Sequence, residues 1–131
     1  MPINVEWGNS EHSVIIRRFR GKWDWGDFQA ASDELNMMLS EVDDPVISIL
    51  DLSKSAAPPP GVFARAKALM DNIDPAVEMT IVVGINVAVR RVFDIISQVF
   101  NARFAACNAI MVTTMEEAYK VIGAKTIEHD W

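Results

Sequence analysis

The 131-residue sequence has one cysteine, two histidines and fewer basic than acidic side chains. A single cysteine cannot form an internal disulfide, which fits a reducing compartment. The widely separated histidines and the cysteine give no recognisable metal-binding spacing, so we expect no metal ion and no cofactor. The net charge of −6 disfavours general binding to nucleic acid or to anionic membranes, because both require a basic protein surface.

Long apolar segments are also missing. The segment nearest to a membrane span, 79–89, is interrupted by Asn86 and is followed by two arginines. Residues 1–6 have neither the basic start nor the apolar core of a signal peptide, so we expect a cytoplasmic protein without stable membrane insertion. Half of the residues are hydrophobic and 23% are charged, which is typical of one globular domain.

The order of segment types predicts an α/β fold. Five segments rich in β-branched, aromatic or other apolar residues predict strands: 5–7, 12–20, 46–52, 79–85 and 109–112. Four segments with apolar residues at helical spacing predict helices: 24–42, 62–73, 87–103 and 115–122. We therefore expect a mixed, mainly parallel sheet of about five strands flanked by four helices. Residues 1–123 would form this single domain, and residues 124–131 a C-terminal tail.

Local signals mark the expected ends of some elements. Asp24 precedes the first helix and is a good N-cap residue. Thr113 and Thr114, followed by Glu116 and Glu117, offer a capping box for the last helix, and Gly123 is expected to end that helix. Cys107 lies at the start of a predicted strand and is expected to be a small core residue.

The residues around the central strand carry a family resemblance. Asp51-Leu52-Ser53 ends this strand, Gly61 opens the next helix, and residues 113–118 (TTMEEA) lead into the last helix. With the order of elements over residues 3–123, these residues resemble a STAS domain, in particular the divergent SpoIIAA-like group of anti-sigma-factor-antagonist-like proteins. The resemblance implies a STAS-like fold and a non-catalytic regulatory or scaffolding domain that acts through protein–protein contacts.

One departure from that family matters for function. Its antagonists carry an Asp-Ser-Ser-like triplet before the glycine, and a partner kinase phosphorylates one serine. Pro58, Pro59 and Pro60 occupy these positions here and have neither a hydroxyl nor a backbone N–H. The phosphoserine switch cannot be transferred, but the resemblance still implies a homodimer and a protein partner such as a kinase-like signalling protein. The expected contact residues are Asp51, Ser53, Ser55, Pro58, Pro59, Pro60, Gly61 and Phe63.

Candidate catalytic groups do not form a complete set. Asp51 follows a parallel strand, as a phosphoacceptor aspartate does, but no acidic pair follows the first long strand to hold Mg²⁺. The simpler interpretation is that Asp51 accepts hydrogen bonds from its own loop. Ser53 and Ser55 remain as hydroxyls for modification, without a base nearby in sequence. We therefore expect that the protein is not an enzyme.

A second hypothesis comes from the aromatic and methionine residues. The third predicted helix has a wider apolar face than packing on one sheet requires, which indicates either a self-association face or a cleft for an apolar ligand. Tryptophan is enriched at contact sites. In this hypothesis the protein is a small carrier or sensor that holds a lipid-like ligand between a helix and the sheet. The expected cleft residues are Trp23, Trp25, Met37, Met38, Phe63 and Met70.

The only basic cluster lies on and after the first long strand: Arg17, Arg18, Arg20 and Lys22. Alternation along a strand places Arg18 and Arg20 on one face and Arg17, with Phe19, on the other. Phe19, Trp23 and Trp25 lie among these residues, and an anionic or nucleic-acid ligand is one interpretation of this basic-aromatic cluster. The acidic residues Asp24 and Asp27 nearby favour the other, a solvated and ion-paired sheet edge.

Overall fold

The computed structural model describes residues 2–84, 87–106 and 108–126 of the chain, without the side chains of residues 87–89, 103–104 and 124–126. The elements follow in the order β1 (Ile3–Trp7), β2 (Val14–Gly21), α1 (Trp25–Leu39), β3 (Val46–Ser55), α2 (Val62–Asp71), β4 (Val77–Val83), α3 (Val87–Val99), α4 (Asn101–Ala106), β5 (Ala109–Val112) and α5 (Met115–Thr126).

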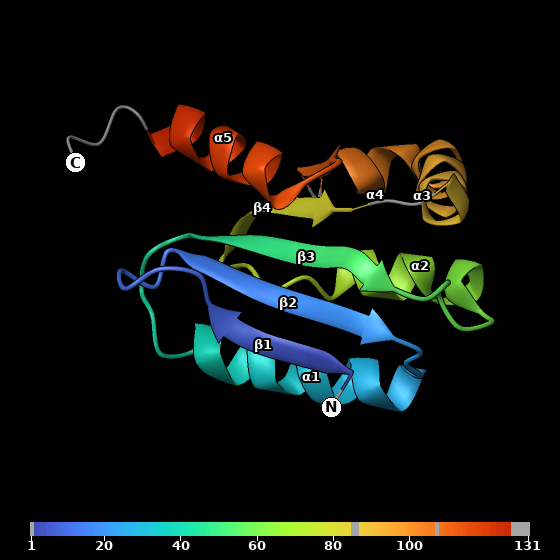
Figure 1. Ribbon diagram of the computed structural model, residues 1–131, viewed down its shortest axis with the longest axis horizontal. Coiled ribbons are helices and arrows are strands. Elements are labelled where there is room, and N and C mark those ends of the chain that lie inside the picture. The colour runs from blue at the N-terminus through green and yellow to red at the C-terminus, as the bar shows by residue number, and fades with distance from the viewer. Residues whose placement is uncertain (1, 85–86, 107, 127–131) are drawn as a thin grey trace.

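The five strands form one sheet in the order β1-β2-β3-β4-β5 (Figure 1). The β1–β2 pair is antiparallel, and the other three pairs are parallel. The predicted fold class, a mainly parallel mixed sheet flanked by helices, is confirmed. Most element boundaries differ from the prediction by a few residues. The largest differences are that β3 continues to Ser55, that α1 ends at Leu39, and that the segment expected as one third helix consists of α3 and α4.

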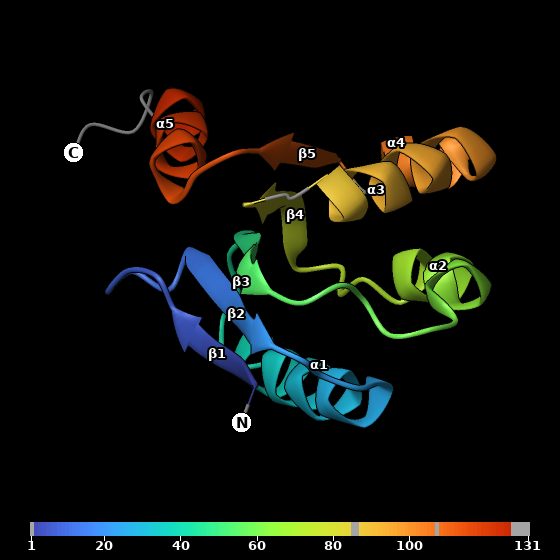
Figure 2. The same cartoon turned by 45° about the vertical axis from the view of Figure 1, so that its right-hand side comes forward.

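Helices cover the two faces of the sheet unequally. In Figure 2, α1, α2 and α3 lie on one side of the sheet and α5 lies on the other. Short strands joined by helices give this arrangement, because parallel neighbours need a crossover connection that passes over a face of the sheet.

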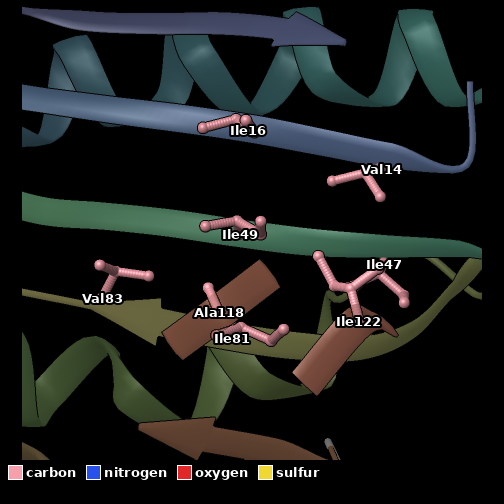
Figure 3. Packing of buried hydrophobic residues seen from close by; sticks show 8 residues of the cluster. All are labelled: Val14, Ile16, Ile47, Ile49, Ile81, Val83, Ala118 and Ile122. Atoms are coloured by element: carbon pink, nitrogen blue, oxygen red, sulfur yellow. The ribbon is translucent and has the colours of Figure 1, made fainter. Parts of the chain in front are cut away.

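The face under α5 is a closely packed aliphatic core (Figure 3). Alternate residues of β2, β3 and β4 point to this face and meet two α5 residues one turn apart: Val14, Ile16, Ile47, Ile49, Ile81, Val83, Ala118 and Ile122. Each large side chain buried in this way contributes about 1.5–3 kcal/mol relative to an exposed one. Two further buried clusters lie on the opposite face, between the sheet and α1.

The helix ends follow the capping signals with one exception. Asp24 accepts a hydrogen bond from the backbone N–H of Asp27, and the Asp27 side chain accepts one from Asp24 in return, so α1 begins with a capping box. The Thr114 hydroxyl accepts from the backbone N–H of Glu117 at the start of α5, as predicted. The prediction that Gly123 ends this helix is wrong, because α5 continues to Thr126.

Two predictions fall on parts of the chain outside the described residues: the core position of Cys107 and the tail beyond residue 126. Among the helices that the structure describes, none combines the length and the hydropathy needed to cross a bilayer.

Candidate functional site

A cavity of about 570 Å³ lies on the face of the sheet opposite α5, beneath α1, α2 and α3. Its floor is formed by inward-facing residues of β2, β3 and β4, among them Leu50, Leu52 and Val82. Its volume lies within the range of about 300–1,000 Å³ that is typical of small-molecule pockets. Protein interiors normally contain few voids larger than a water molecule, so this space is a distinctive feature of the fold.

The cavity exists because α2 does not pack closely against the sheet. Ala66 is the one buried residue among those of α2, whereas Val62, Leu69 and Met70 are half-buried and line the cavity. A helix with apolar residues at these spacings normally buries them against its neighbours. Here those side chains form one wall of an open space.

Contacts from the start of α1 hold α2 in place. The indole N–H of Trp25 donates a hydrogen bond of 2.8 Å to the carbonyl oxygen of Pro60, which precedes α2. The Arg65 guanidinium carbon lies 4.8 Å from the centre of a Trp25 ring, a cation–π distance. Gly61, with φ of +94°, makes the left-handed turn that opens α2. The proline segment therefore positions the α2 wall of the cavity.

An aromatic cluster forms the cavity wall near the carboxyl ends of the strands. Phe19 and Trp23 have ring centroids 5.1 Å apart, and Trp25 and Phe28 have centroids 5.6 Å apart, both edge to face. The Trp23 indole N–H donates to the Ser55 hydroxyl at 2.8 Å. All four rings line the cavity. Because both indole N–H groups have protein partners, these rings offer an apolar surface to whatever occupies the space.

Two polar side chains in the cavity wall have unused hydrogen-bonding atoms. Ser48, in β3, is 1% exposed, and its hydroxyl oxygen has no hydrogen-bond partner. The buried Nε of Arg17, in β2, also has none. Burial lowers the pKa of Arg17 to about 10, so its guanidinium remains protonated at neutral pH. Buried polar groups are almost always hydrogen-bonded, and buried charges are almost always paired.

Arg18, the next residue of β2, lies on the opposite face of the sheet. Unlike Arg17, it is surrounded by acidic partners. Its guanidinium forms ion pairs with Glu6 at 2.6 Å and Asp51 at 3.2 Å. The hydrogen bond with Glu6 is the main cause that raises the pKa of Arg18. Of the basic cluster expected to be ion-paired, Arg18 has ion pairs among the described residues, and its acidic partners are Glu6 and Asp51. The aspartates expected there from the sequence cap α1 instead.

Asp51 and the two loop serines form hydrogen bonds within the protein. Asp51 accepts from the Ser53 hydroxyl at 2.6 Å and from the Ser53 backbone N–H at 3.1 Å, which confirms the loop-bonding interpretation. The Ser55 hydroxyl donates to the carbonyl oxygen of Ala56 at 2.7 Å. Asp51 and Ser53 do not line the cavity. Within the part of the chain that the structure describes, no group of three acidic, histidine or cysteine residues is arranged to hold a metal ion.

The structure brings together only part of the cleft expected from the sequence. Trp23, Trp25 and Met70 line the cavity, as does Pro58 of the expected contact loop. The other three expected cleft residues lie elsewhere. Met38 packs in a separate cluster beside Leu35 and Leu39, while Met37 and Phe63 are 69% and 45% exposed and do not line the cavity. Pro59, Pro60 and Gly61 are half-buried or exposed.

From the sequence, Arg17 was expected only as one member of a basic cluster for which an anionic ligand was one interpretation, and Ser48 was not expected in a site. The sequence does contain a signal for the inward position of both residues. Alternation already placed Arg17 on the same face as Phe19, which is a core position, and Ser48 is a hydroxyl within an apolar run. A charge and a hydroxyl at inward positions of adjacent strands indicate a polar spot inside an otherwise apolar layer.

No protein-family model matches this chain, and no curated protein matches it significantly. What defines the class of the protein is therefore its own structure: an α/β domain with a largely apolar cavity between the sheet and three helices. The resemblance to the STAS family stays a prediction.

Proposed function

We propose that this protein is a non-enzymatic carrier or sensor that binds an apolar, lipid-like small molecule between the sheet and helices α1 to α3. The cavity of about 570 Å³ is the observation that supports this function. Its walls are mainly apolar and aromatic, with a few polar groups, which is the composition of small-molecule pockets. Transfer of an apolar chain from water into this space is favourable by about 0.8 kcal/mol for each buried methylene group.

The polar residues around the cavity indicate where the ligand enters. Gln29 and Asn36 of α1 and Asn72, which follows α2, line the cavity and are exposed. Exposed polar side chains at the rim of an apolar space are typical of a mouth that opens to water. We place the entrance between α1 and the carboxyl end of α2.

Calorimetric titration with 1-decanol, an uncharged single-chain ligand, tests this function. We expect saturable binding of one molecule to the wild-type protein. Leu69→Trp fills the cavity from α2 and should abolish binding, whereas the control Met37→Trp adds the same ring at an exposed position of α1 outside the cavity and should not. The proposal fails if neither decanol nor decanoate binds saturably to the wild-type protein.

A second candidate is a STAS-like regulatory or scaffolding domain that acts as a homodimer and binds a protein partner. Two exposed apolar features favour it. Phe63 is exposed beside the proline segment, where the resemblance places partner contacts. Ile95 and Val99 are exposed one turn apart on α3, at 46% and 66%. In this candidate function, α3 forms the contact between two copies.

Sedimentation equilibrium tests the dimer. The wild-type protein should sediment as a dimer, and Val99→Asp should sediment as a monomer, because a charge at this exposed apolar position opposes association. A wild-type monomer at high protein concentration contradicts the α3 dimer, without bearing on the cavity.

A further inference from the structure

We infer that the ligand is a single-chain carboxylate whose head group is bound by Arg17 and Ser48 and whose chain lies along the aromatic wall. This inference rests on the proposed function and adds the chemistry of the polar end of the ligand. It follows from the position, burial and charge of the two residues.

Arg17 and Ser48 lie on adjacent parallel strands and face the same cavity. In the register of β2 and β3, Arg17 is opposite Leu50. Ser48 lies two residues before Leu50 on β3, on the same face of the sheet. Thr80 of β4 is directly opposite Ser48 and also lines the cavity. The floor therefore presents a guanidinium and two hydroxyl side chains over three neighbouring strands.

The unused donors define what the head group must supply. The Ser48 hydroxyl and the Arg17 Nε–H are buried, and neither forms a hydrogen bond within the described residues. In the proposed complex both donate to the head group of the ligand. A carboxylate has two oxygen atoms that accept several hydrogen bonds, and it pairs with the planar guanidinium in a bidentate geometry.

The charges around the cavity favour one negative charge on the ligand. Arg17, Arg65 and Asp74 are the charged side chains among the described residues that line it. Arg65 is exposed and stacked on Trp25, and Asp74 accepts a hydrogen bond from the backbone N–H of Ala76. Arg17, a half-buried residue whose Nε is fully buried, is thus the cation without a compensating acid among these lining residues, and a monoanion neutralises it. A phosphate dianion would bring a second charge, for which the lining offers only the exposed Arg65.

The apolar wall begins at the head-group site. The guanidinium carbon of Arg17 lies 5.9 Å from the centre of the Phe28 ring, which belongs to the aromatic cluster with Phe19, Trp23 and Trp25. A chain attached to a carboxylate at Arg17 therefore meets apolar surface from its first carbons onward. A head group and a chain are both accommodated, which is the requirement for an amphiphile.

The test compares decanoate with 1-decanol by calorimetry at pH 8, where the carboxylate is ionised. The wild-type protein should bind decanoate about tenfold to a hundredfold more tightly than decanol, the range expected for a charge-assisted hydrogen bond. Arg17→Met should remove this preference but keep decanol binding, which also shows that the variant is folded. Ser48→Ala should reduce the preference severalfold. The control Arg20→Met changes an exposed arginine of the same strand. This variant should keep the preference for decanoate over decanol.

Three results would overturn the inference while leaving the proposed function intact: equal affinity of the wild-type protein for decanoate and decanol, a preference for decanoate that survives in Arg17→Met, or tighter binding of decyl phosphate than of decanoate. Failure of every ligand to bind saturably would instead reject the proposed function, and the inference with it.

Discussion

At the scale of residues, Arg17 and Arg18 show how strand alternation gives neighbouring arginines opposite roles. Arg18 faces the α5 side, where Glu6 and Asp51 neutralise it. Arg17 faces the cavity, and burial lowers its pKa to about 10. Since this value is below that of an arginine in the unfolded chain, the protonated form destabilises the fold at all pH values below about 10. Arg18 is ion-paired, whereas Arg17 has no acidic partner among the described residues.

Arg17→Met should stabilise the ligand-free protein. The substitution removes a partly desolvated charge that has no acidic partner among the described residues, and it places an apolar side chain of similar length in a largely apolar cavity. We expect the free energy of unfolding to rise by about 1–3 kcal/mol, measured by urea denaturation. The exposed control Arg20→Met should stay within about 0.5 kcal/mol of the wild-type value. A loss of stability in Arg17→Met would mean that the charge has a partner in the folded protein.

Arg18→Met should have the opposite effect on the same measurement. It removes the cationic partner of Asp51, which is 9% exposed and keeps only its hydrogen bonds from Ser53. We expect a loss of about 1–3 kcal/mol, because the charge on Asp51 remains buried and loses its counter-ion. Equal stability of Arg18→Met and the wild-type protein would show that the ion pair between Arg18 and Asp51 contributes nothing to the free energy of unfolding.

At the scale of elements, the sequence predicted which segments form strands and helices and in what order. Runs such as 46–52 are apolar on both faces, as buried parallel strands must be. The distance of each helix from the sheet was less predictable from the sequence. Helical spacing shows which side of α2 is apolar, but the distance between that side and the sheet depends on the contact of Trp25 with Pro60, which joins segments far apart in sequence. A cleft between a helix and the sheet, with Trp23, Trp25 and Met70, was therefore expected from the sequence, but its α2 wall and the inclusion of Ser48 required the structure.

The end of β4 provides a test of how closely β3 and β4 approach. A Cβ atom at Gly84, where φ is +79°, would lie 2.4 Å from the Cα of Ser53. At Gly21, where φ is +61°, an added Cβ meets nothing within 4 Å. We expect Gly84→Ala to lower the free energy of unfolding by more than about 2 kcal/mol and the matched Gly21→Ala by about 1 kcal/mol, measured by urea denaturation. Equal losses would contradict the close approach at Gly84.

At the scale of the whole molecule, the two faces of the sheet have different tasks. The α5 face is packed with aliphatic side chains and stabilises the domain (Figure 3). The helices α1, α2 and α3 cover the other face (Figure 2). That face also has buried clusters under α1, but it contains the cavity and the unpaired atoms of Arg17 and Ser48. In the proposed function, the ligand binds on this face while the α5 face stays closely packed.

Ligand binding should be visible as added stability of the whole domain. A ligand that binds only the folded state at one hundred times its dissociation constant adds about 2.7 kcal/mol. Decanoate at this concentration should therefore raise the thermal midpoint of the wild-type protein by several degrees, measured by differential scanning calorimetry. The midpoint of Leu69→Trp, whose cavity is filled, should not change. An equal rise in both proteins would place the binding outside the cavity.

Native mass spectrometry of the protein after incubation with decanoate tests the central claim, that the cavity binds one small amphiphile, most directly. We predict one added decanoate on the 14.6 kDa chain, saturating at a single equivalent, and no added mass on Leu69→Trp. The absence of an adduct on the wild-type protein, or equal adducts on both proteins, would contradict it.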